Sequence, residues 1–424
     1  MGNESARPDD AREAAQVRLA VRRAFTDAPA HGRAPRPAIQ YSREVDRMGL
    51  LLAEARQSIV PGTVAGGLRA VAVLRPGKGG DASAHEVATV RFAAARIAAL
   101  LGLDYAQAGR RAAGNGGECY WLPLSTLSRE QAAAAGILDE SRLWGGVVPF
   151  AFVATKLVSH PLWRKDAAAP AGWKAVRGIE DCTLPGYSVF ARQDAEEAGI
   201  HLLQAGDIRL KCAHARGGHG QVVIRGERQL AQWLDSAAGE AVADGLVVER
   251  HLVQSITYSI GSTRLPGHDI AYHGEQRNVV DRAGAEVYGG SVLTVWRGDF
   301  STLCAELPEG EVAGAVRAAM RYDRLVRANY QVLASRRNYD VIAGVDSRGR
   351  RHLGVLEQSW RFGGASMAEV LAMERFAERP GLPWAIAETV ESYGDGPLPP
   401  GAVEYWPGDA KSPRKYARIV RDGC

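Results

Sequence analysis

The stretch RLKCAHARGGHGQVVI, residues 209–224, places the strongest constraint on how this chain can fold. It begins and ends with residues that favour β-strands, and a basic loop rich in glycine joins the two strands. Lys211 lies on the first strand, directly before the loop. Two interpretations fit this pattern: a loop that closes over phosphate groups, or a surface hairpin with a loose turn. The segment by itself does not decide between them.

Length and composition limit the class of protein. A chain of 424 residues is longer than one hydrophobic core supports, so two or three domains are expected. The net charge of +4 is small, and we expect neither a nucleic-acid nor a membrane partner. No apolar run approaches the roughly 18 residues of a membrane span. The five cysteines form no C-x-x-C pair, which favours a reducing, cytoplasmic location over a disulfide framework or a zinc site.

The order of predicted elements divides the chain into five parts. The fold class expected is α/β and α+β, because a strand at 70–74 and a helix at 84–101 are followed by two regions of mixed strands and helices. The parts are a polar N-terminal arm (1–40), an α/β domain (41–150), a small α+β subdomain (151–245), a large α+β subdomain (246–380) and a C-terminal extension (381–424).

A predicted hairpin carries two carboxylates. Apolar runs at 338–343 and 354–359 flank the turn sequence DSRG, which indicates paired strands. Asp340 and Glu357 lie on the two arms and can therefore share a metal such as Mg²⁺, which prefers oxygen ligands. The structural alternative makes Asp340 an edge residue and pairs Glu357 with Arg361.

Positive charge for phosphate groups comes from two separate elements. Lys156 lies near the start of a predicted helix, and Lys211 follows on a strand before the glycine-rich loop. Backbone N–H groups in such a loop can bind phosphate oxygens, and glycine permits the close approach. The alternatives are a solvated helix lysine for Lys156 and a solvent-facing strand residue for Lys211.

Taken in order, these pieces resemble the ATP-grasp superfamily, over roughly residues 150–370. More narrowly, the chain resembles an uncharacterised bacterial ATP-grasp family of unknown function. The matching pieces are Thr155-Lys156, Arg209-Leu210-Lys211 with Gly217-Gly218-His219-Gly220, Val247–Leu252, Tyr339-Asp340-Val341 and Leu356–Arg361.

The resemblance implies that ATP lies between two α+β subdomains, with Mg²⁺ as a second cofactor. It implies phosphate contacts for Lys156 and Lys211, with Lys211 also near the adenine. The loop would fold over the phosphates through Gly217, Gly218, His219 and Gly220. A hinge would run from Glu249 to Leu252, with backbone groups of Arg250 and Leu252 at the adenine edge.

The resemblance also implies roles around the reacting groups. Asp340 and Glu357 would hold Mg²⁺, and Arg361 would act with Lys211 near the transferred phosphate or the reactive carboxylate. The chain departs from the family at Ser359, since the usual pattern Glu-x-Asn is here Glu357-Gln358-Ser359. Serine can offer an oxygen to a metal, but a weaker one than the asparagine carbonyl.

The function expected is that of an ADP-forming ligase. A small-molecule carboxylate would be phosphorylated by ATP, and an amine or another nucleophile would then displace phosphate. Arg277, Arg297 and Arg336 are weaker candidates for binding substrate. A phosphotransferase on the same fold and a non-catalytic nucleotide-binding protein remain open, as does a homodimer.

Overall fold

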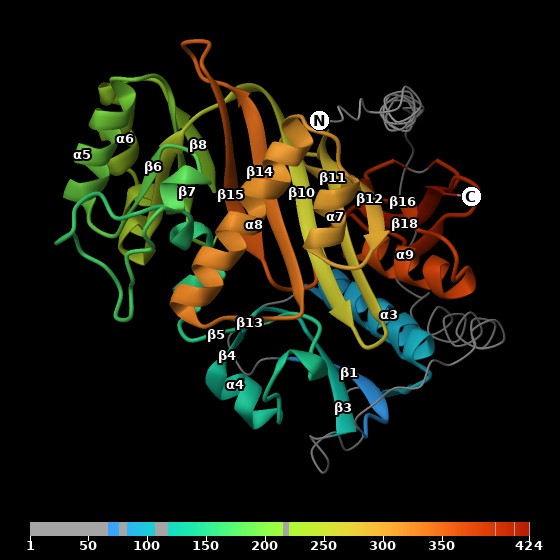
Figure 1. The fold of residues 1–424 in the computed structure, drawn as a ribbon. Helices are drawn as coiled ribbons and strands as arrows, with labels where there is room; N and C mark the ends of the chain where they lie inside the picture. Colours follow the sequence, from blue (N-terminus) through green and yellow to red (C-terminus); the bar gives the residue numbers. More distant parts are fainter. Residues whose placement is uncertain are drawn as a thin grey trace, which may run out of the picture.

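The structure is a computed structural model that describes residues 67–75, 83–106, 118–214, 220–394, 396–410 and 412–423. Strands within these residues form four sheets, the largest of eight strands. Figure 1 shows a four-stranded sheet at the upper left of this large sheet and the N-terminal sheet below it. In the described part of the chain, no helix combines the length and apolar composition that crossing a bilayer requires.

The N-terminal region is a small parallel sheet with one long helix. Strand β1 (Ala70–Leu74) lies between β2 (Asp104–Ala106) and β3 (Cys119–Pro123), and α3 (Ala84–Leu101) connects β1 to β2. Helix α3 begins at Ser83, which forms a capping box with Glu86. Together these elements confirm the predicted strand and helix.

A second small sheet follows, with a short helix beside it. Strand β5 (Gly146–Val148) lies between β4 (Leu127–Ser128) and β13 (Leu333–Ala334). Helix α4 (Arg129–Ala134) begins at Ser128, which forms a capping box with Gln131. The helix expected to begin near 154 is wrong. Two 3-10 turns, Ala151–Ala154 and Lys156–Ser159, occupy this segment instead.

The small subdomain is a four-stranded sheet in the order β6-β9-β7-β8, and its helices pack on one face (Figure 1). Its strands are β6 (Gly186–Val189), β7 (Ile208–Cys212), β8 (Gln221–Ile224) and β9 (Leu246–Arg250). Its helices are α5 (Arg192–Leu203) and α6 (Glu227–Leu234), and a 3-10 segment covers Ala237–Asp244. Alternate residues of β7, Ile208 and Leu210, enter the core beneath the helices.

The large subdomain contains the eight-stranded antiparallel sheet, in the order β15-β14-β10-β11-β12-β16-β18-β17. The strands are β10 (Val253–Leu265), β11 (His268–Val280), β12 (Glu286–Arg297), β14 (Arg336–Val345), β15 (Arg351–Ser359), β16 (Trp384–Ser392), β17 (Val403–Trp406) and β18 (Arg414–Asp422). The helices are α7 (Phe300–Glu306), α8 (Glu311–Tyr330) and α9 (Ser366–Glu378).

The large sheet is buried by different helices at its two halves. Helix α8 packs against β10, β14 and β15, whereas α9 packs against β12, β16 and β18 and also touches α3. Residues of β11 alternate between the two cores: Ile270 and Tyr272 belong to the core with α9, and Ala271 to the core with α8. The predicted fold class, an α/β domain followed by two α+β subdomains, is confirmed.

Segment 381–424 supplies three strands to this same sheet. Strand β16 pairs with β12 along its length, and β18 pairs with β16. The proline and glycine clusters of this segment obscure its strand pattern, and the segment was therefore expected to be an extension. Helix α9, which was not expected from the sequence, connects β15 to β16.

We expect Gly290→Ala to destabilise the protein by at least about 2 kcal/mol. Gly290 has φ +130°, and a Cβ there would lie 2.1 Å from the Thr389 carbonyl oxygen, so β12 would have to separate from β16. Urea denaturation measures the change. Gly381→Ala is the control, because a Cβ at Gly381 meets no atom within 4 Å. Equal stability of the two variants would contradict the close pairing of β12 with β16.

Candidate active site

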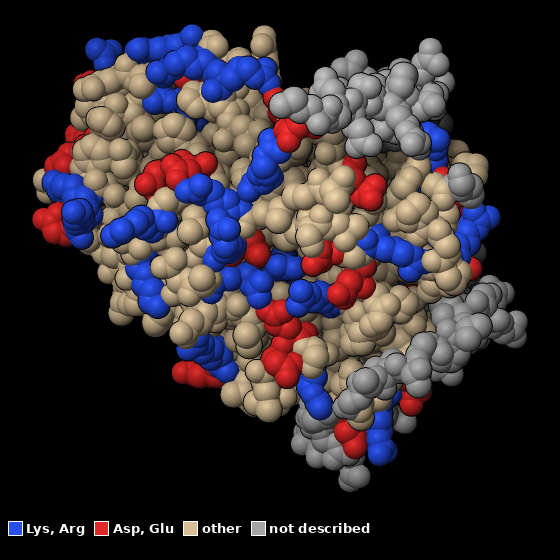
Figure 2. Space-filling model, viewed as in Figure 1, with Lys and Arg blue, Asp and Glu red and all other residues tan. Residues whose placement is uncertain are grey.

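One cleft of about 1310 Å³ runs along β9, β10, β14 and β15. It is larger than the usual 300–1,000 Å³ of a site for one small molecule. Figure 2 shows acidic and basic side chains lying beside one another across the middle of the molecule. The residues predicted from the sequence that line the cleft are Lys156, Lys211, Glu249, Arg250, Leu252, Arg336, Asp340, Glu357, Ser359 and Arg361.

The predicted loop is described only at its end. Gly217, Gly218 and His219 lie outside the described residues. Gly220 directly precedes β8 with φ +63°, and its carbonyl accepts a hydrogen bond from the Cys212 N–H at 3.1 Å. This left-handed conformation favours glycine at the point where the second strand begins.

Lys211 lies buried in the cleft wall, where it forms an ion pair. Its ammonium group lies 2.5 Å from Oε1 of Glu249, and Oε2 of Glu249 lies 3.0 Å from Nε2 of His160. Burial by itself would raise the pKa of Glu249, but the Lys211 charge and the His160 hydrogen bond outweigh it and lower that pKa to about 2. Glu249 therefore stays charged at neutral pH and fixes the position of Lys211.

His160 is a part of this group that sequence reasoning missed. It lies 89 residues before Glu249 and its side chain is fully buried. No local pattern in the sequence identifies it, because the contact depends on how the segment after Lys156–Ser159 lies beside β6, which pairs with β9. The solvent-facing alternative for Lys211 is wrong, since this side chain is only 9% exposed.

Lys156 is also buried and ion-paired. Its ammonium group lies 3.1 Å from Oε2 of Glu357, so the alternative of a solvated helix lysine is wrong. Gln358 fixes the turn that carries Lys156, because its Nε2 donates to the carbonyls of Val153 and Thr155 at 2.8 Å each. The structural alternative paired Glu357 with Arg361. The ion pair observed for Glu357 is with Lys156 instead.

Asp340 and Glu357 are register partners on β14 and β15, as the predicted hairpin requires. Asp340 accepts hydrogen bonds from Nε2 of Gln276 at 2.7 Å and from Nδ2 of Asn338 at 3.0 Å. Burial and then the neighbouring Glu357 carboxylate raise the pKa of Asp340 to about 7. A cation bound between the two carboxylates would offset both the burial of the Asp340 charge and its repulsion by Glu357.

The carboxylates of this hairpin fit a divalent cation whose other coordination positions are filled by a bound ligand. Mg²⁺ is commonly held by one or two protein carboxylates, with phosphate oxygens and water at its other positions. Asp340 and Glu357 supply two carboxylates. Among the described residues, no group of three or more His, Cys, Asp or Glu side chains is placed to hold a metal. The site therefore suits a cation that arrives with phosphate groups.

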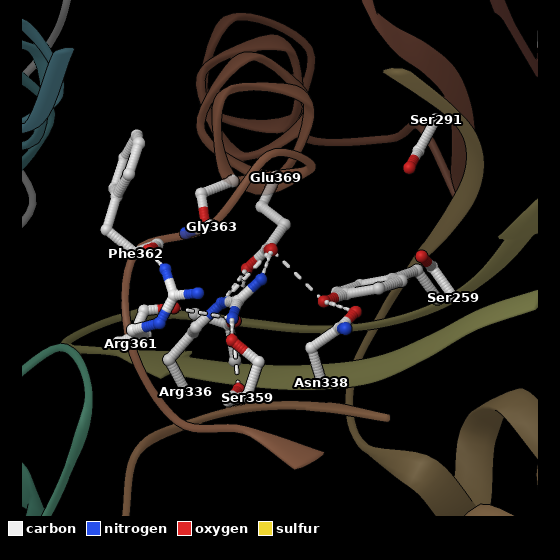
Figure 3. A network of polar contacts seen from close by, with 12 residues as sticks. Ser259, Ser291, Arg336, Asn338, Ser359, Arg361, Phe362, Gly363 and Glu369 are labelled. Atoms are coloured by element: carbon white, nitrogen blue, oxygen red, sulfur yellow. Dashed lines mark hydrogen bonds and ion pairs between the residues drawn. The ribbon is translucent and has the colours of Figure 1, made fainter. Parts of the chain in front are cut away.

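Arg336 organises the segment from Ser359 to Arg361 (Figure 3). Its Nη1 donates to the carbonyl oxygens of Ser359 at 3.0 Å and of Arg361 at 2.6 Å, and lies 3.4 Å from the Ser359 hydroxyl. On its other side, the guanidinium group forms a buried ion pair with Glu369 at 2.6 Å. Arg361 lines the cleft, and its Nη1 donates to the carbonyl of Phe362 at 2.8 Å.

The other two arginines considered for substrate binding have structural contacts. Arg297 donates to backbone carbonyls of the segment after α9, among them that of Leu382 at 2.8 Å. Arg277 donates to the carbonyl of Gly289 at 3.1 Å. Neither residue is among those that line the cleft.

The hinge strand is fixed by its own side chains. The Arg250 guanidinium donates to the carbonyls of Leu202 at 3.0 Å and Gly206 at 2.6 Å, and its backbone N–H donates to Pro185 at 2.9 Å. Its N–H is thus engaged, so the contribution of Arg250 to an adenine edge would come from its carbonyl. Apolar side chains, including Leu252 and Ile342, line the cleft here.

The structure places two α+β regions around one cleft, which is the arrangement that the resemblance in the sequence implied. The chain belongs to the family described as "Protein of unknown function (DUF3182)", whose model matches residues 73–420. No curated protein matches the chain.

Several solved structures are similar to the chain at low sequence identity. D-alanyl-alanine synthetase A from Vibrio cholerae is 11% identical, with 71% of this chain and 90% of that chain covered and a TM-score of 0.41. The biotin carboxylase of Campylobacter jejuni, in a complex with beta-gamma-ATP, is 12% identical, with 83% and 87% covered and a TM-score of 0.46. The biotin carboxylase domain of Hydrogenobacter thermophilus 2-oxoglutarate carboxylase is 12% identical, with 84% and 87% covered and a TM-score of 0.48.

We expect Asp340→Asn to stabilise the metal-free protein at pH 8 by a few kcal/mol. The pKa of Asp340 is about 7 in the folded protein, against roughly 4 when unfolded. Between these values the unfolded chain loses the proton first, so stability falls as pH rises from about 4 to 7. Because asparagine does not titrate, the variant does not show this fall in stability between pH 4 and 7.

Thermal melting across pH 4 to 8 measures the effect. The difference between variant and wild type should vanish near pH 4 and reach its full size above pH 7. Asp166→Asn, at an exposed position, is the control for removing one negative charge. A constant difference over the whole pH range would contradict the assignment.

Proposed function

We propose that the protein is an ATP-dependent, ADP-forming ligase that joins a small-molecule carboxylate to an amine or another nucleophile. The observation that supports this most is that Lys156, Lys211, Asp340, Glu357 and Arg361 line one cleft. These residues come from four separate segments of the chain. A chance surface distribution would not bring three cations and two carboxylates to the same walls.

Lys156 and Lys211 would bind the phosphate groups. In this structure each ammonium group is paired with one carboxylate, Glu357 and Glu249 respectively. A phosphate chain in the cleft would lie against both lysines and bring them a second negative partner. Because the two lysines stand on different elements, they can hold a phosphate chain from two sides and fix its direction.

Asp340 and Glu357 would hold Mg²⁺ at the phosphate groups, with Arg361 near the transferred phosphate. Mg²⁺ would supply charge neutralisation during phosphoryl transfer. The chain's own contribution is to position these charges before the reaction, since the Arg336 guanidinium, the Gln276 amide and the Asn338 amide already fix this region by hydrogen bonds.

The carboxylate substrate would occupy the part of the cleft beyond the hairpin. This part is lined by residues of the N-terminal domain, of β12 and of the C-terminal strands, among them Thr126, Tyr288 and Tyr393. An acyl phosphate formed there must be kept from water. The predicted loop at 217–220 remains our candidate for that cover.

We expect Mg²⁺ with ATP to stabilise the wild type by about 2.7 kcal/mol at a hundred times its Kd. Lys211→Ala should lose most of this effect because the buried cation at the phosphate site is removed. Thermal melting with and without ligand measures both. Lys165→Ala, at an exposed position, is the matched control and should keep the full shift. Equal shifts in the two variants would contradict the role of Lys211.

The reaction class is tested with hydroxylamine and a panel of carboxylic acids. A ligase of this type should release ADP and give a hydroxamate with its own substrate, because an acyl phosphate is electrophilic at carbon. A phosphotransferase would give ADP and a stable phosphoester without hydroxamate. AMP as the main nucleotide product would overturn the proposal.

A further inference from the structure

We propose that the nucleotide site takes a single divalent cation, which Asp340 and Glu357 hold. The reason is that the Arg336 guanidinium group already lies beside Ser359. This inference rests on the proposed binding of a nucleotide with a metal. It assigns Ser359 to the fixed protein scaffold rather than to the metal ligands. It also gives Arg336 a role as a positioning residue.

Both oxygens that Ser359 could offer to a metal face a permanent positive charge. Nη1 of Arg336 lies 3.0 Å from the Ser359 carbonyl oxygen and 3.4 Å from its hydroxyl oxygen. A Mg²⁺ ion binds oxygen at roughly 2.0–2.1 Å, so an ion on this hydroxyl would lie within about 5.5 Å of Nη1. An arginine cannot lose its proton to relieve the repulsion.

Arg336 cannot readily turn away to make room. Its side chain is 1% exposed, and that of its partner Glu369 is 0% exposed. Glu369 also accepts hydrogen bonds from the Thr263 hydroxyl at 2.8 Å and the Tyr272 hydroxyl at 3.0 Å, so its position is fixed from β10 and β11. Separating the pair would leave an uncompensated buried charge, which is strongly unfavourable.

The same contacts explain how a site with one metal can remain ordered. Nη1 of Arg336 also donates to the Arg361 carbonyl at 2.6 Å, so one guanidinium group fixes the backbone on both sides of Trp360 (Figure 3).

Binding of Mn²⁺ tests the proposal, with electron paramagnetic resonance of the free ion as the readout. The wild type is saturated with a non-hydrolysable ATP analogue and titrated with Mn²⁺. We expect one bound Mn²⁺ per chain. Ser359→Ala should also bind one, with an affinity within twofold of wild type. Ser359→Asn should still bind one, because Arg336 is unchanged. Arg336 itself is not varied, since its loss can unfold the protein.

Two bound Mn²⁺ ions in the wild type, or loss of Mn²⁺ binding in Ser359→Ala while its melting temperature is unchanged, would overturn the inference alone. Binding of a fluorescent ATP analogue is measured first. Absence of that binding would overturn the proposed function and this inference with it, so the two failures are distinguishable.

Discussion

Two carboxylates of like charge lie side by side on one hairpin, and the groups around them are arranged to accommodate that charge. Asp340 and Glu357 are register partners on β14 and β15. Glu357 is paired with Lys156, and Asp340 accepts hydrogen bonds from two amide side chains. The raised pKa of Asp340 shows that these partners only partly compensate its burial and its neighbour. The proposed cation site rests on this incomplete compensation.

Long-range contacts hold the surroundings of the hairpin in place. Gln358 connects β15 to the turn that carries Lys156, and its Oε1 accepts a hydrogen bond from the Tyr322 hydroxyl of α8 at 2.6 Å. Arg336 connects β14 to the segment after β15 and, through Glu369, to α9. Polar groups buried in this way must be fully paired, and paired groups specify one arrangement of the elements. The walls of the cleft are therefore fixed by the core beneath them.

The cleft also depends on parts of the chain that carry none of the predicted residues. Residues of the N-terminal domain, Glu391 of β16 and the segments that connect the C-terminal strands line its far end. The C-terminal strands β16, β17 and β18 extend the sheet that bears Asp340, so both ends of the cleft border one continuous β-sheet. Differences in substrate among proteins with this type of fold can arise in such added strands while the carboxylate hairpin is unchanged.

The sequence by itself determined the elements whose pattern is local. The alternation around the glycine-rich loop and the turn DSRG each depend on a few adjacent residues. The order of Lys156, Lys211, Asp340 and Glu357 along the chain was enough to indicate a shared site. Only the tertiary structure decided what those side chains touch. His160 beside Glu249, Glu369 beside Arg336 and the strands of 381–424 beside β12 lie far apart in sequence, and burial and pairing in space bring them together.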